Sequence, residues 1–209
     1  MSKPVYYYFN LRARGELPRL VAAAGKVEIE DKRIPFSEWP GQYKSKTPYG
    51  QLSALVVDGH WYAQKLAITL FLARKAGLYP TSGNPVDILK YDHVLNFTEE
   101  VLEQVVVALV DKHIHNKPEK LEKLKQDVLD AKIPIFEKLL TQNGTGYFVG
   151  DKLSVVDLSA FDVTEHLVDL HGKAYLDSYP LLKAHFDRVG KNENIKKYIA
   201  SRPAPEYNL

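Results

Sequence analysis

The sequence predicts an α/β domain with a mixed sheet, followed by a domain made only of helices. A β-branched and aromatic run, Val5–Phe9, leads directly into a helical pattern. Asp58-Gly59, between two apolar runs, is the strongest short signal for a β-hairpin in the chain. Beyond residue 84 the strand signals stop and one helical face takes over. Its apolar residues recur every seven positions, at Ile88, Leu95, Leu102 and Leu109.

The first three elements are expected to form a β-α-β unit. Val5–Phe9 predicts a strand buried on both faces, and residues 15–24 predict a helix with its apolar side chains on one face. Gly25 is expected to end this helix in a left-handed conformation. Residues 27–34 alternate in part and predict a second strand, which is parallel to the first because a helix connects the two.

The next segment, residues 36–50, is rich in proline, glycine and serine, which predicts an extended surface connection with a short turn near Trp39. Residues 52–57 and 60–62 flank the hairpin turn and are expected to pair as antiparallel strands. A helix is predicted over residues 64–76, closed by Gly77. This order of elements, β-α-β and then β-β-α, is that of a thioredoxin-like domain.

A linker is predicted at residues 79–84, which divides the chain into domains at 1–78 and 85–209. The second domain is expected to open with one long helix that carries the seven-residue repeat. Its antiparallel partner is predicted from Leu121 to Leu140, with a bend at Pro134.

The end of the chain is also expected to be helical. Ser154 and Asp157 have the spacing of an N-terminal capping box, with aspartate in place of the usual glutamate or glutamine. They predict the start of a helix that ends at Gly172. Two last helices are expected to begin at Tyr179-Pro180 and at Asn194, and the tail that follows is expected to lie over the surface.

The bulk composition limits the possible functions. The 209 residues carry a formal net charge of +2, with 45% hydrophobic and 26% charged residues, as in an ordinary soluble protein. Charge so near balance predicts no nucleic-acid partner. No apolar run is long enough to span a bilayer or to form a signal core, so a cytosolic protein without a membrane partner is expected. The absence of cysteine excludes disulfides, thiolate metal sites and a cysteine nucleophile.

His113 and His115, in the loop expected after the long helix, invite a metal hypothesis. No third ligand has suitable local spacing, however, and histidines at a helix end also interact favourably with its dipole. We therefore expect no metal.

The carboxyl end of the first strand is where the sequence suggests chemistry. Side chains alternate along a strand, so Tyr6 and Tyr8 point to one face, and Tyr8 lies at the end where α/β proteins usually bind ligands. A phenol there, with the Arg14 guanidinium six residues on, can donate a hydrogen bond to a developing anion. The alternative is that these tyrosines are core aromatics with solvated hydroxyls.

Six short motifs occur in order along the chain. They are Tyr8-Phe9-Asn10 with Arg14 and Glu16; Ser37-Glu38-Trp39-Pro40; Thr47-Pro48-Tyr49-Gly50-Gln51-Leu52; Val57-Asp58-Gly59; Gln64 with Leu66-Ala67-Ile68; and Gly150-Asp151-Lys152-Leu153-Ser154-Val155-Val156-Asp157. Together they resemble the cytosolic glutathione transferases. Within that family the chain resembles the sigma class, which includes glutathione-dependent prostaglandin D synthases and is similar to the lens S-crystallins. The resemblance implies a glutathione-binding thioredoxin-like domain, a helical domain with the electrophile pocket, and a homodimer.

The resemblance also implies roles for individual residues. Tyr8 would donate a hydrogen bond to the glutathione thiolate, and Arg14 would supply a supporting charge. Trp39 and Lys44 would hold the glycyl end and its carboxylate, with Lys46 as an alternative to Lys44.

The remaining implied contacts involve the other two units of glutathione. The turn Gly50-Gln51-Leu52 would pair with the cysteinyl backbone. Gln64 and Lys65 stand where the family binds the γ-glutamyl carboxylate. Glu100 of a partner subunit, with Glu99 as the second choice, would reach the amine. The same resemblance implies a place for Tyr49 in the dimer interface.

Three positions depart from the family pattern. Ser53 stands where the family has a cis-proline, so the loop either keeps a cis bond or moves to trans. Lys65 stands where the family has a serine; the backbone N–H and the helix dipole remain, and lysine could pair with the carboxylate or occupy its space. Ala13 stands where the family commonly has glycine.

Two functions are compatible with this sequence. The first is a glutathione transferase that acts on small hydrophobic electrophiles, with isomerase or peroxidase side activity. Its second substrate would lie between the domains, near Phe9, Arg14 and residues 105–109. The second is a catalytically weakened relative that binds ligands or has a structural role, as the crystallins do. Ser53 and Lys65 favour the second function, and the retained site residues favour the enzyme.

Overall fold

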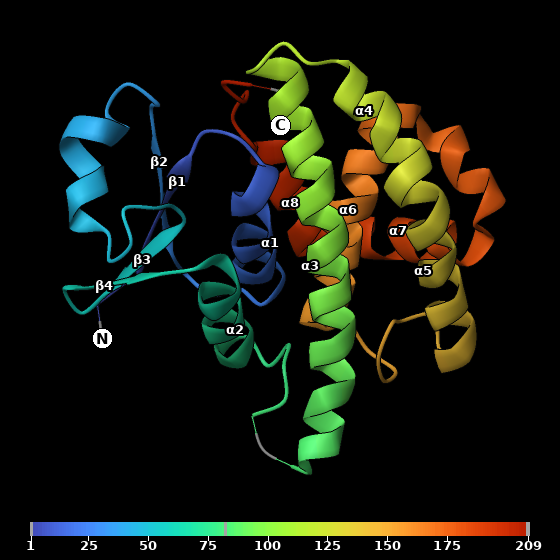
Figure 1. The fold of residues 1–209 in the computed structure, drawn as a ribbon. Helices are drawn as coiled ribbons and strands as arrows, with labels where there is room; N and C mark the ends of the chain where they lie inside the picture. The colour runs from blue at the N-terminus through green and yellow to red at the C-terminus, as the bar shows by residue number, and fades with distance from the viewer. Residues whose placement is uncertain (1, 82, 208–209) are drawn as a thin grey trace.

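The computed structural model describes residues 2–81 and 83–207. Its N-terminal domain is a four-stranded sheet of order β2-β1-β3-β4. The strands are β1 (Val5–Phe9), β2 (Glu30–Ile34), β3 (Ala54–Val57) and β4 (His60–Ala63), and the helices of this domain are α1 (Glu16–Ala24) and α2 (Lys65–Lys75). β1 is parallel to β2 and antiparallel to β3, which is antiparallel to β4. The predicted α/β domain is confirmed (Figure 1).

Alternation along β1 decides which side chains face the helices. Tyr6 and Tyr8 are buried, whereas Val5, Tyr7 and Phe9 on the opposite face are half-buried. The two tyrosines therefore belong to the core between the sheet and the helices, as the period of two in a strand requires.

Two turns show how well local signals predict backbone conformation. Asp58 and Gly59 have φ values of 48° and 83°, the pair of positive angles that a two-residue hairpin turn needs, so the predicted hairpin is confirmed. The prediction for Gly25 is wrong: its φ is −87°, and Lys26 has the positive φ of 53°. A Cβ at Gly25 would overlap Ala76, so this glycine allows the ends of α1 and α2 to approach.

The connection over residues 36–50 has the turn predicted near Trp39, but the rest of it is less extended than predicted. It contains short helical turns at Trp39–Tyr43 and Lys44–Lys46, and Pro40 at the start of the first one presets φ for a turn. β2 also begins later than predicted, at Glu30. The reason is that the Val27 N–H donates to the Ala22 carbonyl at 2.9 Å and so still belongs to the end of α1.

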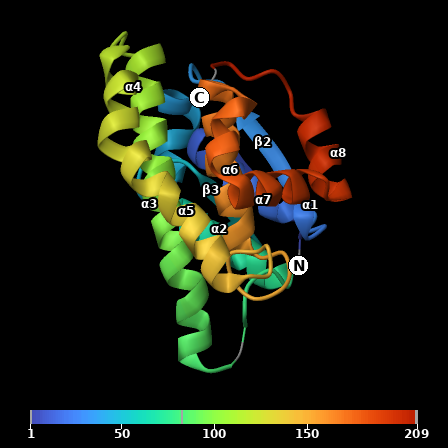
Figure 2. The ribbon, with the colours of Figure 1, turned by 90° about the vertical axis from the view of Figure 1, so that its right-hand side faces the viewer.

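The second domain is all helical, as predicted. Its helices are α3 (Pro85–His113), α4 (Glu119–Leu124), α5 (Asp130–Asn143), α6 (Val155–His171), α7 (Pro180–Gly190) and α8 (Glu193–Ser201). α3 stands between the sheet domain and the pair α4 and α5 (Figure 1). α6 packs against both α3 and α1, and α7 crosses it (Figure 2). None of the helices in the described part of the chain is both long and apolar enough to cross a membrane.

The long helix carries the predicted apolar repeat. Leu95, Leu102 and Leu109 are buried and Ile88 is half-buried. The Asn84 side chain accepts a hydrogen bond from the Val86 N–H at 2.9 Å and so caps the helix. The linker expected at residues 79–84 includes Ser82, which lies outside the described residues, as do Met1, Asn208 and Leu209 at the ends of the two expected domains.

Three details of the helical domain differ from prediction. The partner of α3 is not one bent helix: a π-helical turn, Lys125–Leu129, separates α4 from α5 just before Pro134, whose ring crowds the carbonyl four residues earlier. His113 is the last residue of α3 and not part of the loop. α8 is capped by Asn192, whose side chain accepts from the Asn194 N–H, so Asn194 lies inside the helix.

The predicted capping box at α6 is present and belongs to a larger buried cluster. The Ser154 N–H donates to Asp157 Oδ2 at 2.8 Å. The other carboxylate oxygen accepts from the Phe148 N–H at 2.9 Å and lies 3.1 Å from His185 Nε2. Asp157 therefore joins the start of α6 to the preceding loop and to α7.

The C-terminal tail lies over the surface, as predicted, up to residue 207. The Asn10 side-chain amide donates to the Ala204 carbonyl, and the Glu206 N–H donates to the Asn10 carbonyl, both at 2.8 Å. The Tyr207 ring meets Phe36 edge-on, with centroids 5.5 Å apart.

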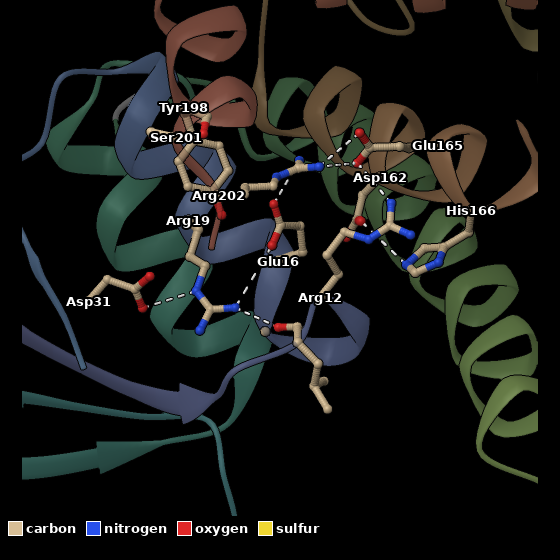
Figure 3. A network of polar contacts seen from close by, with 12 residues as sticks. Arg12, Glu16, Arg19, Asp31, Asp162, Glu165, His166, Tyr198, Ser201 and Arg202 are labelled. Carbon is tan, nitrogen blue, oxygen red and sulfur yellow. Dashed lines mark hydrogen bonds and ion pairs between the residues drawn. The ribbon is translucent and has the colours of Figure 1, made fainter. Parts of the chain in front are cut away.

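A network of charged side chains joins the two domains (Figure 3). At its centre Arg12, Arg19 and Arg202 pair with Glu16, Asp31 and Glu165, and at its edges Arg12 also pairs with Asp169 and Asp31 with Arg33. Glu16 Oε1, fully buried at the start of α1, lies 2.7 Å from Arg202 Nη2. Arg202 Nη1 in turn donates to both oxygens of Glu165 on α6 at 2.9 Å. The network thus joins α1 to α6 and to the segment after α8.

Two titratable groups of α6 lie beside this network, and Figure 3 shows both. His166 Nε2 is 3.7 Å from Asp162 Oδ1, and both side chains are buried. Burial raises the pKa of the Asp162 carboxyl well above its usual range, and the nearby Glu16 acts in the same direction. Burial, with a smaller effect of Arg12, lowers the pKa of His166 to about 3. His166 is therefore uncharged at neutral pH.

His166 should make stability depend on pH. Between pH 6.5 and about 3 the unfolded chain binds a proton at residue 166 that the folded chain does not, so stability falls as pH falls through this window. We expect the free energy of unfolding of the parent, relative to His166→Asn, to be about 2 kcal/mol lower at pH 5 than at pH 7.5. Urea unfolding of both proteins at the two pH values measures this difference. Asp162 is present in both proteins, so its own contribution to the pH dependence cancels. If the stability difference between the parent and His166→Asn were the same at both pH values, the low pKa of His166 would be contradicted.

Candidate functional site

A cleft of about 820 Å³ lies where the sheet domain meets α3. Its walls come from the end of β1 and the turn after it, the loop before β3, the start of α2 and one face of α3. The lining residues are Phe9, Arg14, Trp39, Gly50, Gln51, Leu52, Gln64, Lys65, Leu66, Asn96, Glu99, Glu100 and Glu103. Most of the predicted site residues are therefore brought together from distant parts of the sequence; Tyr8 and Lys44 are not among the lining residues.

Tyr8 lies next to the cleft and not on its surface. It directly precedes Phe9, which lines the cleft together with Arg14, yet the Tyr8 side chain is only 4% exposed. A Cβ at Gly15 would overlap the Tyr8 ring, so glycine is needed there for the ring to lie against the start of α1. The Tyr6 hydroxyl donates to the Gly15 carbonyl at 3.1 Å and fixes the same junction.

The electrostatic surroundings of Tyr8 keep its hydroxyl protonated. Burial raises the pKa of Tyr8 to about 12, while the positive charges of Arg14 and Arg19 act in the opposite direction. A hydroxyl with this pKa is a hydrogen-bond donor throughout the neutral range.

Arg19 is a part of this site that the sequence did not single out. Its guanidinium carbon lies 5.5 Å from the Tyr6 ring centroid and 5.6 Å from that of Tyr8. It also donates to the carbonyls of Leu11 at 2.7 Å and Phe9 at 3.2 Å, and so supports the turn that carries Arg14. The available signal was a single charged residue inside an otherwise uncharged stretch of helix.

In the turn between β1 and α1, Ala13 stands where the family commonly has glycine, and its backbone has a conformation typical of glycine. Ala13 has a φ of 38°, in the region that favours glycine. Arg14 follows it and makes a two-pronged ion pair with Glu103 of α3, with Nε 2.7 Å from Oε2. The charge of Arg14 is therefore shared between Tyr8 and a carboxylate in the opposite wall.

The loop before β3 and the start of α2 form the next wall. The Leu52–Ser53 peptide bond is cis, which is the first of the two alternatives expected for this loop. Gln64 precedes α2 with a φ of 78°, an unfavourable value for a residue other than glycine. Such conformations cluster at binding sites, and Gln64 lines the cleft.

Lys65 is the first residue of α2 and pairs across the cleft with Glu99 of α3. Glu99 is buried, and it also accepts a hydrogen bond from Ser159 Oγ at 3.0 Å. Its neighbour Glu100 is exposed and pairs with Lys132 of α5. The lysine therefore contacts a carboxylate of its own chain.

Trp39 lines the cleft, and the two candidate lysines follow it in the sequence. The Trp39 ring meets Phe9 edge-on, with centroids 6.0 Å apart. Lys44 is exposed, with its side chain beside Gly50, which lines the cleft. Lys46 instead has its ammonium 5.3 Å from the Tyr43 ring centroid. Of the two lysines, Lys44 is the one that this geometry brings to the cleft.

The wall expected from residues 105–109 does not form part of this cleft. Val105 is fully buried, and Leu109 lines a separate cavity of about 470 Å³ with Arg12 and His166. The cleft meets α3 one to two turns earlier, between Asn96 and Glu103. Among the described residues, no group of three histidine, aspartate or glutamate side chains is arranged to hold a metal ion.

Comparison with known proteins gives the family of this chain. Residues 99–202 match the family model described as "Glutathione S-transferase, C-terminal domain". "Probable glutathione S-transferase 7" of Caenorhabditis elegans is 36% identical over 210 residues, which cover 96% of this chain and 97% of that protein. "S-crystallin SL11" of Nototodarus sloanii is 33% identical over 205 residues, covering 97% of this chain and 98% of the other.

A solved structure agrees over the whole length. The glutathione S-transferase from Ascaris lumbricoides superposes with a TM-score of 0.85 at 30% identity, and the match covers 99% of this chain and 100% of the other. The chain therefore belongs to the glutathione S-transferase family.

Proposed function

We propose that the chain is a glutathione transferase in which Tyr8 stabilises the glutathione thiolate for attack on small hydrophobic electrophiles. The observation that carries the proposal is the cleft, which gathers Arg14, Trp39, Gln64 and the turn at residues 50–52 beside a protonated tyrosine. The family membership of the chain supports the same reaction class.

The free-energy requirement of this mechanism is modest. A thiol has an ordinary pKa of about 8.5, so only a few per cent is thiolate at pH 7. Lowering that pKa by about two units needs about 2.7 kcal/mol of selective stabilisation of the anion. One hydroxyl donor and a nearby cation in a partly dry site can supply this. Tyr8 would be the donor, and Arg14 the cation.

The remaining contacts follow the three units of glutathione. Trp39 and Lys44 would hold the glycyl end, and Leu52 with Gly50 and Gln51 would pair with the cysteinyl backbone. Gln64 and the N-terminus of α2 would bind the γ-glutamyl carboxylate, because a helix N-terminus presents free N–H groups and a positive dipole end.

The finer features of the proposal concern substrate and assembly. The electrophile would enter beside Phe9 and Arg14, and isomerisation and peroxide reduction are proposed as secondary activities of the same thiolate. We propose a cytosolic homodimer of the sigma class, with Tyr49, an exposed aromatic residue, in the subunit interface.

Two measurements test the proposed function. Calorimetry should detect binding of glutathione, and the steady-state rate of its conjugation to chlorodinitrobenzene near neutral pH should exceed the uncatalysed rate. If neither is observed, the proposal is wrong.

A second function is favoured by one observation: both cationic side chains in the cleft, Arg14 and Lys65, are paired with carboxylates of the same chain. This arrangement suits a weakened relative that binds ligands or is structural. The 33% identity to an S-crystallin is compatible with it. Binding of glutathione without conjugation would favour this second function, and conjugation above background would exclude it.

A further inference from the structure

The charged side chains that line the cleft are not balanced. Two of them are cations, Arg14 and Lys65, and three are acids, Glu99, Glu100 and Glu103, which leaves negative charge in excess. Both cations are already paired, Arg14 with Glu103 and Lys65 with Glu99. Among the described residues that line the cleft, no cation is therefore left over for a further anion.

Glutathione would make this excess larger. Bound as the thiolate, it brings two carboxylates and a sulfur anion but only one ammonium group. Lys44, whose side chain lies beside Gly50, is the further cation assigned to it, and the glycyl carboxylate would use that charge. The complex that receives the second substrate therefore contains more negative than positive charge.

Glu103 is the acid on the side of the cleft where the electrophile would enter. Arg14, which lines this side together with Phe9, has its Nε 2.7 Å from Glu103 Oε2. The negative charge of Glu103 also acts to raise the pKa of Tyr8, against the effect of Arg14. The charge of Glu103 thus acts at the hydroxyl assigned to the thiolate, where sulfur and electrophile would meet.

The carboxylate of Glu103 is also accessible from the cleft. Its side chain is 50% exposed, and that of Arg14 is 38% exposed. In the described part of the chain it accepts hydrogen bonds only from Arg14, whereas an ionised carboxylate offers about four acceptor positions. Water screens this charge in a hydrated cleft, and a bound substrate that displaces the water makes its effect stronger.

We propose that Glu103 determines which charge the second substrate can carry, so that the cleft accepts neutral and cationic electrophiles and rejects those with an anionic group near the reacting carbon. This inference rests on the proposed function. An anionic group beside Arg14 would meet both Glu103 and the thiolate, with no further cation to compensate. A cationic group could instead pair with Glu103. Arg14 alone would favour an anionic substrate, so the glutamate reverses the preference.

The reaction itself allows substrates of different charge to be compared. In aromatic substitution the thiolate sulfur forms a bond to the ring carbon that carries chlorine. Chloride then leaves with the electron pair of the broken carbon–chlorine bond. A charged substituent elsewhere on the ring keeps its charge throughout, so its effect on the rate reports the electrostatics of the site.

The test uses one chloronitrobenzene ring with three substituents. The substrates are methyl 4-chloro-3-nitrobenzoate, which is neutral, the free 4-chloro-3-nitrobenzoate anion, and the cationic choline ester of the same acid. Each kcat/KM at pH 7 is divided by the rate constant of the uncatalysed reaction with glutathione, so that differences in intrinsic reactivity cancel.

The proteins are the parent, Glu103→Gln, Glu103→Asp and the matched control Asp111→Asn. Asp111 lies on α3 about two turns after Glu103 and does not line the cleft. Thermal unfolding of each variant checks that it is folded.

In the parent, the normalised rate with the anion is expected to be about 10- to 100-fold below that with the methyl ester, and the rate with the choline ester about 3-fold or more above it. In Glu103→Gln both differences should shrink to less than about 3-fold, because a negative charge is removed and Arg14 loses its partner. Glu103→Asp keeps the charge and should keep the order of the three substrates. Asp111→Asn should leave the ratios within about 2-fold of the parent.

Equal normalised rates with the three substrates in the parent overturn this inference. Ratios that stay unchanged in Glu103→Gln, or that change equally in Asp111→Asn, overturn it too. If the parent conjugates glutathione to none of the three and not to chlorodinitrobenzene either, the proposed function is wrong as well. Conjugation without discrimination by charge overturns only this inference.

Discussion

Replacement of Tyr8 by phenylalanine is expected to lower the rate of glutathione conjugation at pH 6.5 by about 100-fold, because it removes the only hydroxyl assigned to the thiolate. The change deletes one oxygen from a buried side chain and leaves the ring against Gly15. The measurement is kcat/KM with chlorodinitrobenzene from pH 5.5 to 9.5. Its midpoint should rise by about two units, towards the ordinary thiol pKa of about 8.5.

The pH dependence distinguishes the thiol from the phenol. The pKa of Tyr8, about 12, lies above the whole range, so a rise in rate with pH reports ionisation of glutathione. Tyr7→Phe is the matched control: Tyr7 lies on the same strand but on the opposite face, with its ring centroid 4.7 Å from that of Trp61. It should change the rate by less than about 3-fold. Equal midpoints for the parent and Tyr8→Phe would refute the role given to Tyr8.

The fold could be predicted because its signals are local and periodic. An unbroken β-branched and aromatic run identified β1, the two-residue period of a strand placed Tyr6 and Tyr8 on one face, and Asp58-Gly59 identified the hairpin. The seven-residue repeat identified α3 over nearly its whole length. Each of these patterns reports which side of an element meets the core, and burial of that side is the largest stabilising term.

The errors in the fold come from contacts that local patterns do not contain. Gly25 is required by the approach of Ala76, which is 51 positions away in the sequence (76 − 25), and not by its own φ. The break at Lys125–Leu129 has no glycine or proline within it to signal it. Propensity alone cannot predict features set by tertiary packing.

The candidate site was predicted in part for the same reason. Its backbone pieces, such as the turn at residues 50–52 and the start of α2, are short contiguous motifs, and the cleft contains them. The charge partners could not be predicted, since Arg14 and Glu103 are 89 positions apart and on different domains. Ion pairs depend on which long side chains meet after folding, which sequence spacing does not determine.

Arg19 is the clearest case of a residue that only the folded structure identifies, and its replacement by methionine is expected to destabilise the protein by about 3–5 kcal/mol. Its guanidinium donates to Asp31 Oδ1 at 3.0 Å and to the carbonyls of Leu11 and Phe9. Methionine fills a similar volume but cannot donate a hydrogen bond, so the buried Leu11 carbonyl loses the donor that Arg19 supplies. Urea unfolding at pH 7 measures the loss.

The charges that Arg19 leaves behind retain other partners, which limits the expected loss. Asp31 keeps Arg33 at 2.9 Å, and Glu16 keeps Arg202 at 2.7 Å, so the cost comes mainly from the turn that carries Arg14. The matched control is Arg74→Met, on an exposed arginine that lies over the Tyr79 ring, which should cost less than about 1 kcal/mol. If Arg19→Met cost no more than this control, the turn beside Tyr8 would have to be held by its backbone alone.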